Sequence, residues 1–297
     1  MKDLTVLSST SLGFRLYDHE TGEISLHPKR GKATFRKDGI LIGDYVTLDK
    51  DGLIDNVLKR SNQLSRPRLS NADLVLILVS AKEPLFSSYL LDKFLTLTEC
   101  SSMKSAIVIT KCDLLTKKEK EVLIERLSYY QKEGFSYYLV DCHDETKYSY
   151  STLKAAVLGK RVALMGQTGV GKSSLLNLLC PGFQRKVDSL DVEIGRGRHT
   201  TKEVIMLPYE NGFLYDTPGF SELELTDITE NELASFFPGF RGHFASCKFN
   251  DCQHLKETKG CEIVRCVENN DLSADSYYNY LKIREEVRKN NVWKKKI

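Results

Sequence analysis

The sequence predicts a multi-domain protein with a small antiparallel β-barrel, an α/β domain and a small α-rich C-terminal domain. Its 297 residues are too many for one comfortable core and suit two or three domains. Short segments separated by turns fill residues 1–60, and apolar strands alternate with helical patterns from about residue 70. Four of the eight cysteines then gather within twenty residues. We therefore expect domains at 1–63, 64–225 and 226–297.

The overall composition indicates a folded protein without a strong net charge. Apolar residues make up 41% of the chain and charged residues 28%, as in globular proteins. The 43 basic residues are almost balanced by 40 acidic ones, so any binding of nucleic acid requires local basic patches. The segments 28–37 and 292–297 are two such patches, but a solvated loop and a frayed tail explain them equally well.

No targeting or membrane-spanning signal is recognisable in the sequence. The first residues lack the apolar core of a signal peptide, and no apolar run approaches the roughly 20 residues that span a bilayer. We therefore expect a cytoplasmic monomer without membrane attachment, in a compartment where thiols stay reduced. The cysteines then require an explanation other than disulfide bonds.

The N-terminal barrel is predicted from closely spaced strand segments. No helix-length pattern interrupts them, which favours a small antiparallel barrel. An OB-like barrel fits, and such barrels often bind oligonucleotides, although spacing alone does not decide the barrel type. The four segments are 12–18, 23–30, 32–37 and 44–49.

The α/β domain is predicted from a change of hydrophobic period. Residues 73–80 form a continuous apolar run, typical of a strand buried on both faces of a parallel sheet. The segment 87–100 then places apolar residues at helical spacing. Strands and helices continue to alternate, which indicates a doubly wound domain, with further elements expected at 106–110, 117–133, 137–140, 151–158, 161–165, 203–208 and 213–215. A last helical pattern covers 273–291, and Ser273 suits its N-cap.

A phosphate-binding loop lies between an expected strand and an expected helix. The segment 166–173 reads GQTGVGKS and fits the G-x-x-x-x-G-K-[ST] pattern, in the strand–loop–helix context that the pattern requires. Its backbone amides can surround a β-phosphate, Lys172 can neutralise the β and γ oxygens, and Ser173 can ligate Mg²⁺. The alternative is a glycine-rich turn without a ligand. We expect a nucleoside triphosphate to contact Gly166, Gln167, Thr168, Gly169, Val170, Gly171, Lys172, Ser173 and Ser174.

Two later segments match the parts of a nucleotide site that sense the γ-phosphate. Asp216 ends an expected strand and can hold Mg²⁺ through water, while the Gly219 amide can meet the γ-phosphate. Taken alone, the sequence DTPG is also an ordinary turn. Between the two motifs, Thr201 is favoured over Thr200 as a hydroxyl that closes on Mg²⁺ and the γ-phosphate.

The segment Thr110-Lys111-Cys112-Asp113 predicts that the base is guanine. A carboxylate at Asp113 can accept hydrogen bonds from guanine N1–H and N2–H₂, whereas adenine offers no donor there. Lys111 can lie along the ring face. Thr110, Lys111 and Asp113 follow a strand at the sheet edge where ligands bind in α/β folds, although a solvated Lys-x-Asp loop is the simpler alternative.

The order of these motifs is a cyclic shift of the usual GTPase order. The base reader comes first, and the phosphate loop and the Asp216 segment follow. Such shifts are tolerated because domain termini often lie close together. The sequence thus predicts a circularly permuted P-loop GTPase domain.

The cysteine-rich segment has the composition of a structural zinc site. Cys247, Cys252, His254 and Cys261 offer three thiolates and an imidazole, which suit tetrahedral Zn²⁺ with no open position. The alternative is a set of free buried thiols. Cys266 is a fifth candidate ligand that competes with Cys261, and His243 is a weaker sixth.

Several features occur together in this chain: the shifted motif order, the Cys/His cluster and the segments SAKEP, GRGRHTTK and DTPGF. In this combination they resemble the RsgA (YjeQ) family of circularly permuted GTPases. The resemblance covers nearly the whole chain. It implies an N-terminal OB barrel, a permuted GTPase domain and a zinc domain. It also implies Mg²⁺-dependent hydrolysis of GTP to GDP, stimulated by the 30S ribosomal subunit and its 16S rRNA during late maturation of that subunit.

The resemblance also assigns catalytic residues. Phe220 stands where Ras-like proteins use Gln to orient the attacking water, and the family offers His199 in its place, with Lys172 and Thr201. A solvated loop histidine is the alternative for His199. Two departures stand out. The spacing from His254 to Cys261 is one residue longer than usual, and the turn 140–144 replaces the family's Ser-rich guanine-supporting loop.

Three other functions remain open at this level. The chain could be a permuted GTPase for a different ribosomal assembly step, which would typically lack a barrel and a zinc domain together. It could be an RNA-binding module with a purely regulatory nucleotide site, although Lys172, Ser173 and Asp216 are intact. A P-loop kinase or ATPase would have no need for Asp113.

Overall fold

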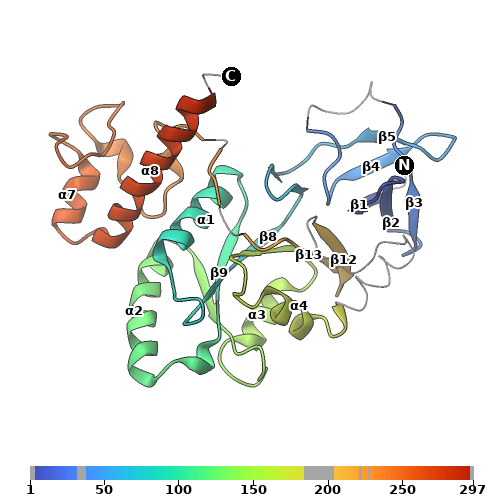
Figure 1. The fold of residues 1–297 in the computed structure, drawn as a ribbon, viewed down its shortest axis with the longest axis horizontal. Coiled ribbons are helices and arrows are strands. Elements are labelled where there is room, and N and C mark those ends of the chain that lie inside the picture. Colours follow the sequence, from blue (N-terminus) through green and yellow to red (C-terminus); the bar gives the residue numbers. More distant parts are fainter. Residues whose placement is uncertain (1–3, 32–37, 184–203, 221–222, 227, 295–297) are drawn as a thin grey trace.

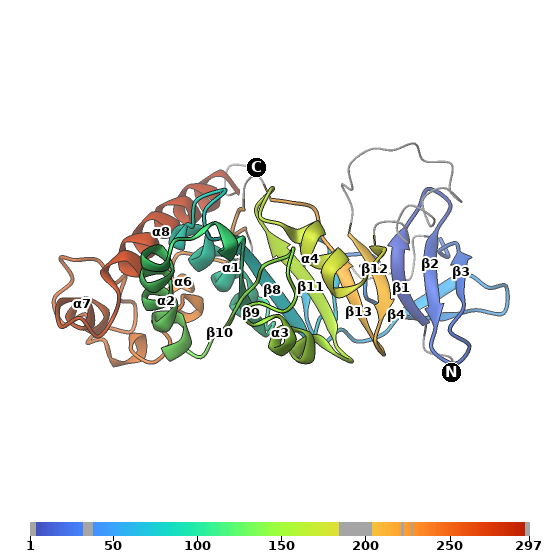
Figure 2. The same ribbon diagram turned by 90° about the horizontal axis from the view of Figure 1, so that it is seen from below.

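A small sheet, a larger sheet flanked by helices and a helical lobe lie in a row (Figures 1 and 2). The computed structural model describes residues 4–31, 38–183, 204–220, 223–226 and 228–294. The larger sheet lies in the middle, and the small sheet and the helical lobe flank it at opposite ends. No helix in these ranges is both long and apolar enough to cross a bilayer.

The small sheet is antiparallel throughout, with the strand order β3-β2-β1-β4-β5. Its two edges approach each other: the Ile54 amide donates to the Pro28 carbonyl over 2.9 Å, and the Arg30 amide donates to the Ile54 carbonyl over 3.1 Å. The first and last strands were not among the expected segments, and the segment 32–37 lies outside the described residues. The strands are β1 (Leu4–Ser9), β2 (Phe14–Asp18), β3 (Ile24–His27), β4 (Tyr45–Leu48) and β5 (Ile54–Val57).

A short hairpin joins the small sheet to the central one. It consists of β6 (Gln63–Leu64) and β7 (Leu69–Ser70). The Tyr215 hydroxyl of the central sheet donates to the Ser70 carbonyl over 2.8 Å, and the Arg161 guanidinium lies 4.5 Å from the Tyr45 ring centroid. The small sheet is therefore packed against the central domain rather than tethered to it.

The central sheet has the order β10-β9-β8-β11-β13-β12, in which every neighbouring pair is parallel except β12 and β13. The doubly wound prediction is thus confirmed. Because a parallel sheet aligns the carboxyl ends of its strands, the loops after β9, β11 and β13 meet at one edge. The strands are β8 (Leu74–Ser80), β9 (Ser105–Thr110), β10 (Ser136–Leu139), β11 (Arg161–Gly166), β12 (Ile205–Tyr209) and β13 (Gly212–Asp216).

Helices cover both faces of this sheet, as the continuous apolar strands predict. Val75 and Ile77 of β8 join the core beneath α1 and α2, whereas Leu76 and Leu78 join the core beneath α3 and α4. Ser87 caps α1 by accepting from the Leu90 amide over 3.3 Å. The flanking helices are α1 (Ser88–Cys100), α2 (Lys117–Lys132), α3 (Tyr150–Val157) and α4 (Lys172–Leu179), with a short 3-10 turn, η1 (Cys112–Leu114), before α2.

The C-terminal lobe is built around a small aromatic core. Phe237, Phe240 and Tyr280 are almost fully buried, and the rings of Phe240 and Tyr280 lie 4.7 Å apart. The predicted cap of the last helix is confirmed, because the Ser276 amide donates to the Ser273 hydroxyl over 3.3 Å. The elements are α6 (Leu233–Phe236), η2 (Phe244–Ser246), α7 (Glu262–Glu268) and α8 (Ala274–Lys294).

A buried carboxylate joins α8 to the central domain. Asp92 of α1 is inaccessible to solvent and accepts hydrogen bonds from the Tyr130 hydroxyl over 2.8 Å and from the Asn279 amide group over 2.7 Å. Burial raises the pKa of Asp92 from 3.8 to about 7, and the nearby Asp275 adds to this effect. The hydrogen bonds from Asn279, Tyr130 and Ser276 only partly offset the cost of burying the charge.

We expect Asp92→Asn to make the free energy of unfolding less dependent on pH. As the pH rises from 4 to 7, the unfolded chain loses the Asp92 proton while the folded chain keeps it, so wild-type stability falls by up to about 4 kcal/mol. Denaturant titrations of the wild type and the variant at pH 5 and pH 8 measure the difference. An unchanged pH slope in the variant would contradict this assignment.

Candidate nucleotide and metal sites

The expected phosphate loop connects β11 to α4 at the ligand-binding edge of the central sheet. Gly169 has φ 81° and Gly171, the N-cap of α4, has φ 93°, which are left-handed conformations that favour glycine. The loop therefore directs its backbone towards the start of a helix, where amide groups point at a bound anion. Ser173 and Ser174 are exposed in the first turn of α4.

Lys172, the first residue of α4, and Asp216, at the end of β13, face the same site. The Lys172 ammonium is folded back onto the loop, where it donates to the carbonyls of Gly166 over 3.0 Å and Gln167 over 3.2 Å. Burial lowers the pKa of Lys172, and the charge of Asp216 opposes this shift. Burial likewise raises the pKa of Asp216 to about 6, and Lys172 opposes it. The two charges are thus close enough to interact, as a shared phosphate and Mg²⁺ site requires.

The segment after Asp216 pairs directly with the phosphate loop. The Phe220 amide donates to the Gly166 carbonyl over 3.2 Å, and the Thr168 amide donates to the Phe220 carbonyl over 3.3 Å. The Phe220 ring lies edge-on to Phe94 of α1, with centroids 5.5 Å apart. A packed aromatic ring cannot orient water, so Phe220 holds this segment in place instead.

We expect Gly219→Ala to weaken GTP binding about tenfold. A methyl group at Gly219 would lie 2.7 Å from the Thr168 hydroxyl oxygen and 3.2 Å from the Lys172 nitrogen, which forces the loop to shift. Overpacking of this kind costs roughly 1–3 kcal/mol. Gly242→Ala is the control, because a methyl group there meets nothing within 4 Å. Equilibrium titration with a fluorescent GTP analogue measures the effect. Equal affinities for both variants would count against the contact between the segment after Asp216 and the phosphate loop.

The expected guanine reader lies beside the phosphate loop. The Thr110 hydroxyl at the end of β9 donates to the Val170 carbonyl over 2.5 Å, so segments sixty positions apart in the sequence are in direct contact. Lys111 adopts a left-handed conformation, with φ 56°, and its ammonium donates to the Glu83 carbonyl. Asp113 follows in η1 with its side chain exposed.

Tyr148, which sequence reasoning did not single out, supports this reader from the segment that follows the turn 140–144. The Tyr148 hydroxyl donates to the Cys112 carbonyl over 3.1 Å, and the Lys120 ammonium lies 4.3 Å from the Tyr148 ring centroid. The buried Asp141 accepts from the His143 amide over 2.9 Å and shapes the same turn. No sequence motif marks Tyr148, because only the fold brings it to Cys112.

The Cys/His cluster in the C-terminal lobe has the dimensions of a tetrahedral metal site. Cys247, Cys252, His254 and Cys261 bring one donor atom each to within 4.8 Å of one another. His254 Nδ1 is 3.5 Å from Cys247 Sγ and 3.6 Å from Cys261 Sγ. A Zn²⁺ ion about 2.3 Å from sulfur and about 2.0–2.1 Å from nitrogen places those ligands about 3.5 Å apart. Burial, aided by Arg284, lowers the pKa of His254 to about 4, which keeps the imidazole neutral as a ligand must be.

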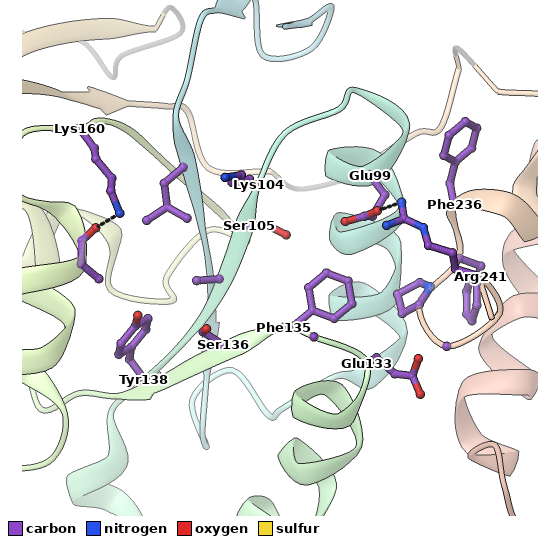
Figure 3. A pocket seen from close by; sticks show the side chains of 17 residues that line it. Glu99, Lys104, Ser105, Glu133, Phe135, Ser136, Tyr138, Lys160, Phe236 and Arg241 are labelled. Atoms are coloured by element: carbon purple, nitrogen blue, oxygen red, sulfur yellow. Dashed lines mark hydrogen bonds and ion pairs between the residues drawn. The ribbon is translucent and has the colours of Figure 1, made fainter. Parts of the chain in front are cut away.

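A cavity at the opposite edge of the sheet is separate from these sites. It has a volume of about 480 Å³ and lies between the starts of β9 and β10 and the segment that follows α6. Glu99 of α1 and Arg241 point towards each other across it and form an ion pair (Figure 3). Ser105 and Ser136 begin their strands here, so the cavity lies away from the ends that carry the phosphate loop.

Two further sequence predictions lie outside the described residues. Thr201, favoured over Thr200, and His199 belong to the segment 184–203. Their predicted roles therefore remain predictions.

Comparison with known proteins gives consistent results. The model of the RsgA GTPase family matches residues 57–226. The small ribosomal subunit biogenesis GTPase RsgA of Bacillus subtilis is 38% identical over 266 residues, which cover 87% of this chain and 88% of the relative. The protein of the same name from Thermotoga neapolitana is 37% identical over 287 residues, 95% of each chain.

Two solved structures also match nearly the whole chain. YloQ, described as a circularly permuted GTPase, has a TM-score of 0.77 and 32% identity over 97% of this chain and 96% of its own. YjeQ from Thermotoga maritima has a TM-score of 0.79 and 33% identity over 96% of this chain and 98% of its own. The contact between β9 and the phosphate loop brings the motifs together in space despite their permuted order. Together with these matches, this arrangement shows that the chain belongs to the RsgA GTPase family.

Proposed function

We propose that this protein hydrolyses GTP to GDP and phosphate and acts on the 30S ribosomal subunit during late maturation of that subunit. The observation that supports the proposal is the hydrogen bond from Thr110 to Val170, which joins the segment proposed to read guanine to the expected phosphate loop in a chain of the RsgA GTPase family. The names of the curated relatives supply the ribosomal step. Such a role places the protein in the cytoplasm.

Each site residue has a proposed role. Asp113 reads the guanine edge, and Thr110 and Lys111 support it. Lys172 neutralises the β and γ phosphates, and Ser173 and Asp216 hold Mg²⁺, directly and through water. Gly219 contacts the γ-phosphate from the Asp216 segment. Thr201 and His199 complete the site when GTP is bound, Thr201 on Mg²⁺ and His199 on the attacking water.

The flanking lobes are proposed to bind RNA and to hold the metal. We assign 1–63 to an OB-like barrel, 64–225 to the permuted GTPase domain and 226–297 to a zinc domain. The strand order and the approach of residues 28–30 to Ile54 support a closed barrel. Exposed basic residues such as Lys29 and Arg30 would contact rRNA phosphates, with an affinity that falls as salt rises. The protein is proposed to act as a monomer, with one structural Zn²⁺ at the site formed by Cys247, Cys252, His254 and Cys261.

The decisive experiment compares GTP hydrolysis with and without purified ribosomal subunits. We expect 30S subunits to raise the turnover rate, and an equal concentration of 50S subunits to leave it unchanged. Stimulation by 50S subunits alone would indicate a different assembly step. A single-turnover assay that releases no phosphate under any condition would indicate a regulatory site instead.

We expect Asp113→Asn to exchange the base preference from guanine to xanthine. The asparagine amide group would face the N2–H₂ donor of guanine, but it can donate to the carbonyl that xanthine carries at that position. Two charge-assisted hydrogen bonds are worth about 1.5–3 kcal/mol each, so GTP affinity should fall at least about 100-fold while XTP affinity rises. Competition binding with GTP, XTP and ATP measures this, and undiminished GTP affinity would remove Asp113 from the site.

A further inference from the structure

A second group of metal-binding side chains lies in the C-terminal lobe, apart from the four residues described above. Glu262 and Cys266 lie one turn apart on α7, and His243 immediately precedes η2. Their donor atoms all lie within 4.8 Å of one another. Cys266 Sγ is 3.4 Å from His243 Nδ1 and 3.6 Å from Glu262 Oε1.

These separations are those of ligands on one tetrahedral ion. An ion about 2.3 Å from sulfur and about 2.0–2.2 Å from nitrogen and oxygen sets the sulfur about 3.5 Å from each of the other two ligands. Cys266 is almost fully buried, while His243 and Glu262 are half-buried and reach the solvent side of the cluster. The Cys266 thiol thus lies on the buried side of the cluster, and the fourth coordination position of a tetrahedral ion remains for water.

We propose that His243, Glu262 and Cys266 form a second metal site, which takes one divalent transition-metal ion, Zn²⁺ first among them. A thiolate and an imidazole select zinc-like ions over Mg²⁺ or Ca²⁺, which take oxygen ligands. Sequence reasoning left Cys266 as a competitor of Cys261 for a single ion. The structure turns Cys266 to His243 instead, so the two sets of ligands share no residue.

The surroundings of Glu262 suit a ligand. Arg265 Nε donates to Glu262 Oε2 over 2.8 Å, and Arg265 Nη2 donates to Glu262 Oε1 over 2.6 Å. These bonds fix the carboxylate in the orientation that brings Oε1 to Cys266, and a carboxylate oxygen retains a lone pair for a metal ion.

The site would stiffen the contact between the lobe and the central domain. His243 lies two residues after Arg241, which forms the ion pair with Glu99 of α1 across the cavity (Figure 3). A metal ion bound both by His243 and by the ligands on α7 would therefore anchor the loop that carries Arg241 and its ion pair.

The test is the zinc stoichiometry of the full-length protein, measured by native mass spectrometry and by zinc titration against a competing chelator. We expect two ions per chain in the wild type and one in Cys266→Ala and in His243→Gln. Cys100→Ser removes a half-buried thiol outside both clusters and should retain two ions. His243→Gln changes a half-buried side chain, so it remains informative if Cys266→Ala does not fold.

Two results would overturn the proposal. One is a wild-type protein that saturates with a single ion. The other is a second ion that persists in His243→Gln with an affinity within about tenfold of that in the wild type, because that ion would then bind elsewhere. Neither result depends on nucleotide hydrolysis, so this proposal can fail independently of the proposed GTPase function.

Discussion

Replacing Lys172 by alanine is expected to abolish GTP hydrolysis. The ammonium group is the cation of the phosphate loop, and it is already held there by the carbonyls of Gly166 and Gln167. Its charge-assisted contact with the phosphates is worth about 1.5–3 kcal/mol, so GTP affinity should fall roughly 10- to 100-fold. Loss of a charge-stabilising donor in the transition state should lower the turnover rate by a further 10²- to 10³-fold.

Two measurements separate this effect from misfolding. Without Lys172, the buried Asp216 loses the charge that opposes the rise of its pKa, so this carboxylate can take up a proton instead of remaining an unpaired buried charge. The thermal unfolding midpoint should therefore change little. Lys132→Ala, an exposed lysine in the last turn of α2, is the matched control and should hydrolyse GTP at the wild-type rate. Wild-type turnover in Lys172→Ala would refute the phosphate-site assignment.

Loss of the Cys247, Cys252, His254 and Cys261 site is expected to unfold the C-terminal lobe while the central domain stays folded. The segment around the metal site has only short helices of its own, since α6 and η2 span four and three residues and α7 spans seven. Zinc supplies on the order of 10 kcal/mol in zinc-finger peptides, which exceeds what such short helices can replace. Cys252→Ser should thus release zinc and expose the amides of residues 243–272.

Hydrogen exchange with mass spectrometry tests this directly. Amides of 243–272 should lose protection in Cys252→Ser, while those of β8, β9 and β11 keep it, because the central sheet has its own core. Cys100→Ser serves as the control, since it removes a thiol that is not a ligand. Full protection of the lobe after chelation of all zinc would show that the aromatic core alone holds it.

In the small sheet and in the cysteine cluster, the sequence predicted part of the structure and missed the rest. Turn spacing predicted strands at 12–18 and 44–49, but it missed β1 and β5, because β1 is buried on both faces and lacks an alternating pattern. Spacing also predicted ligands among the cysteines. It could not assign Cys266, since this residue is separated from His243 by 23 positions along the chain.

The phosphate loop, the alternating α/β domain and the metal-binding composition of the lobe could all be predicted from the sequence. These are local properties, because glycine spacing, hydrophobic period and cysteine clustering are each read within a few tens of residues. Tertiary structure alone decided which distant groups meet: Thr110 with Val170, Tyr148 with Cys112, and Asp92 with Asn279. Such contacts depend on how strands are ordered in the sheet and how helices pack on it, and no local pattern encodes the partner of a side chain 36 to 187 residues away.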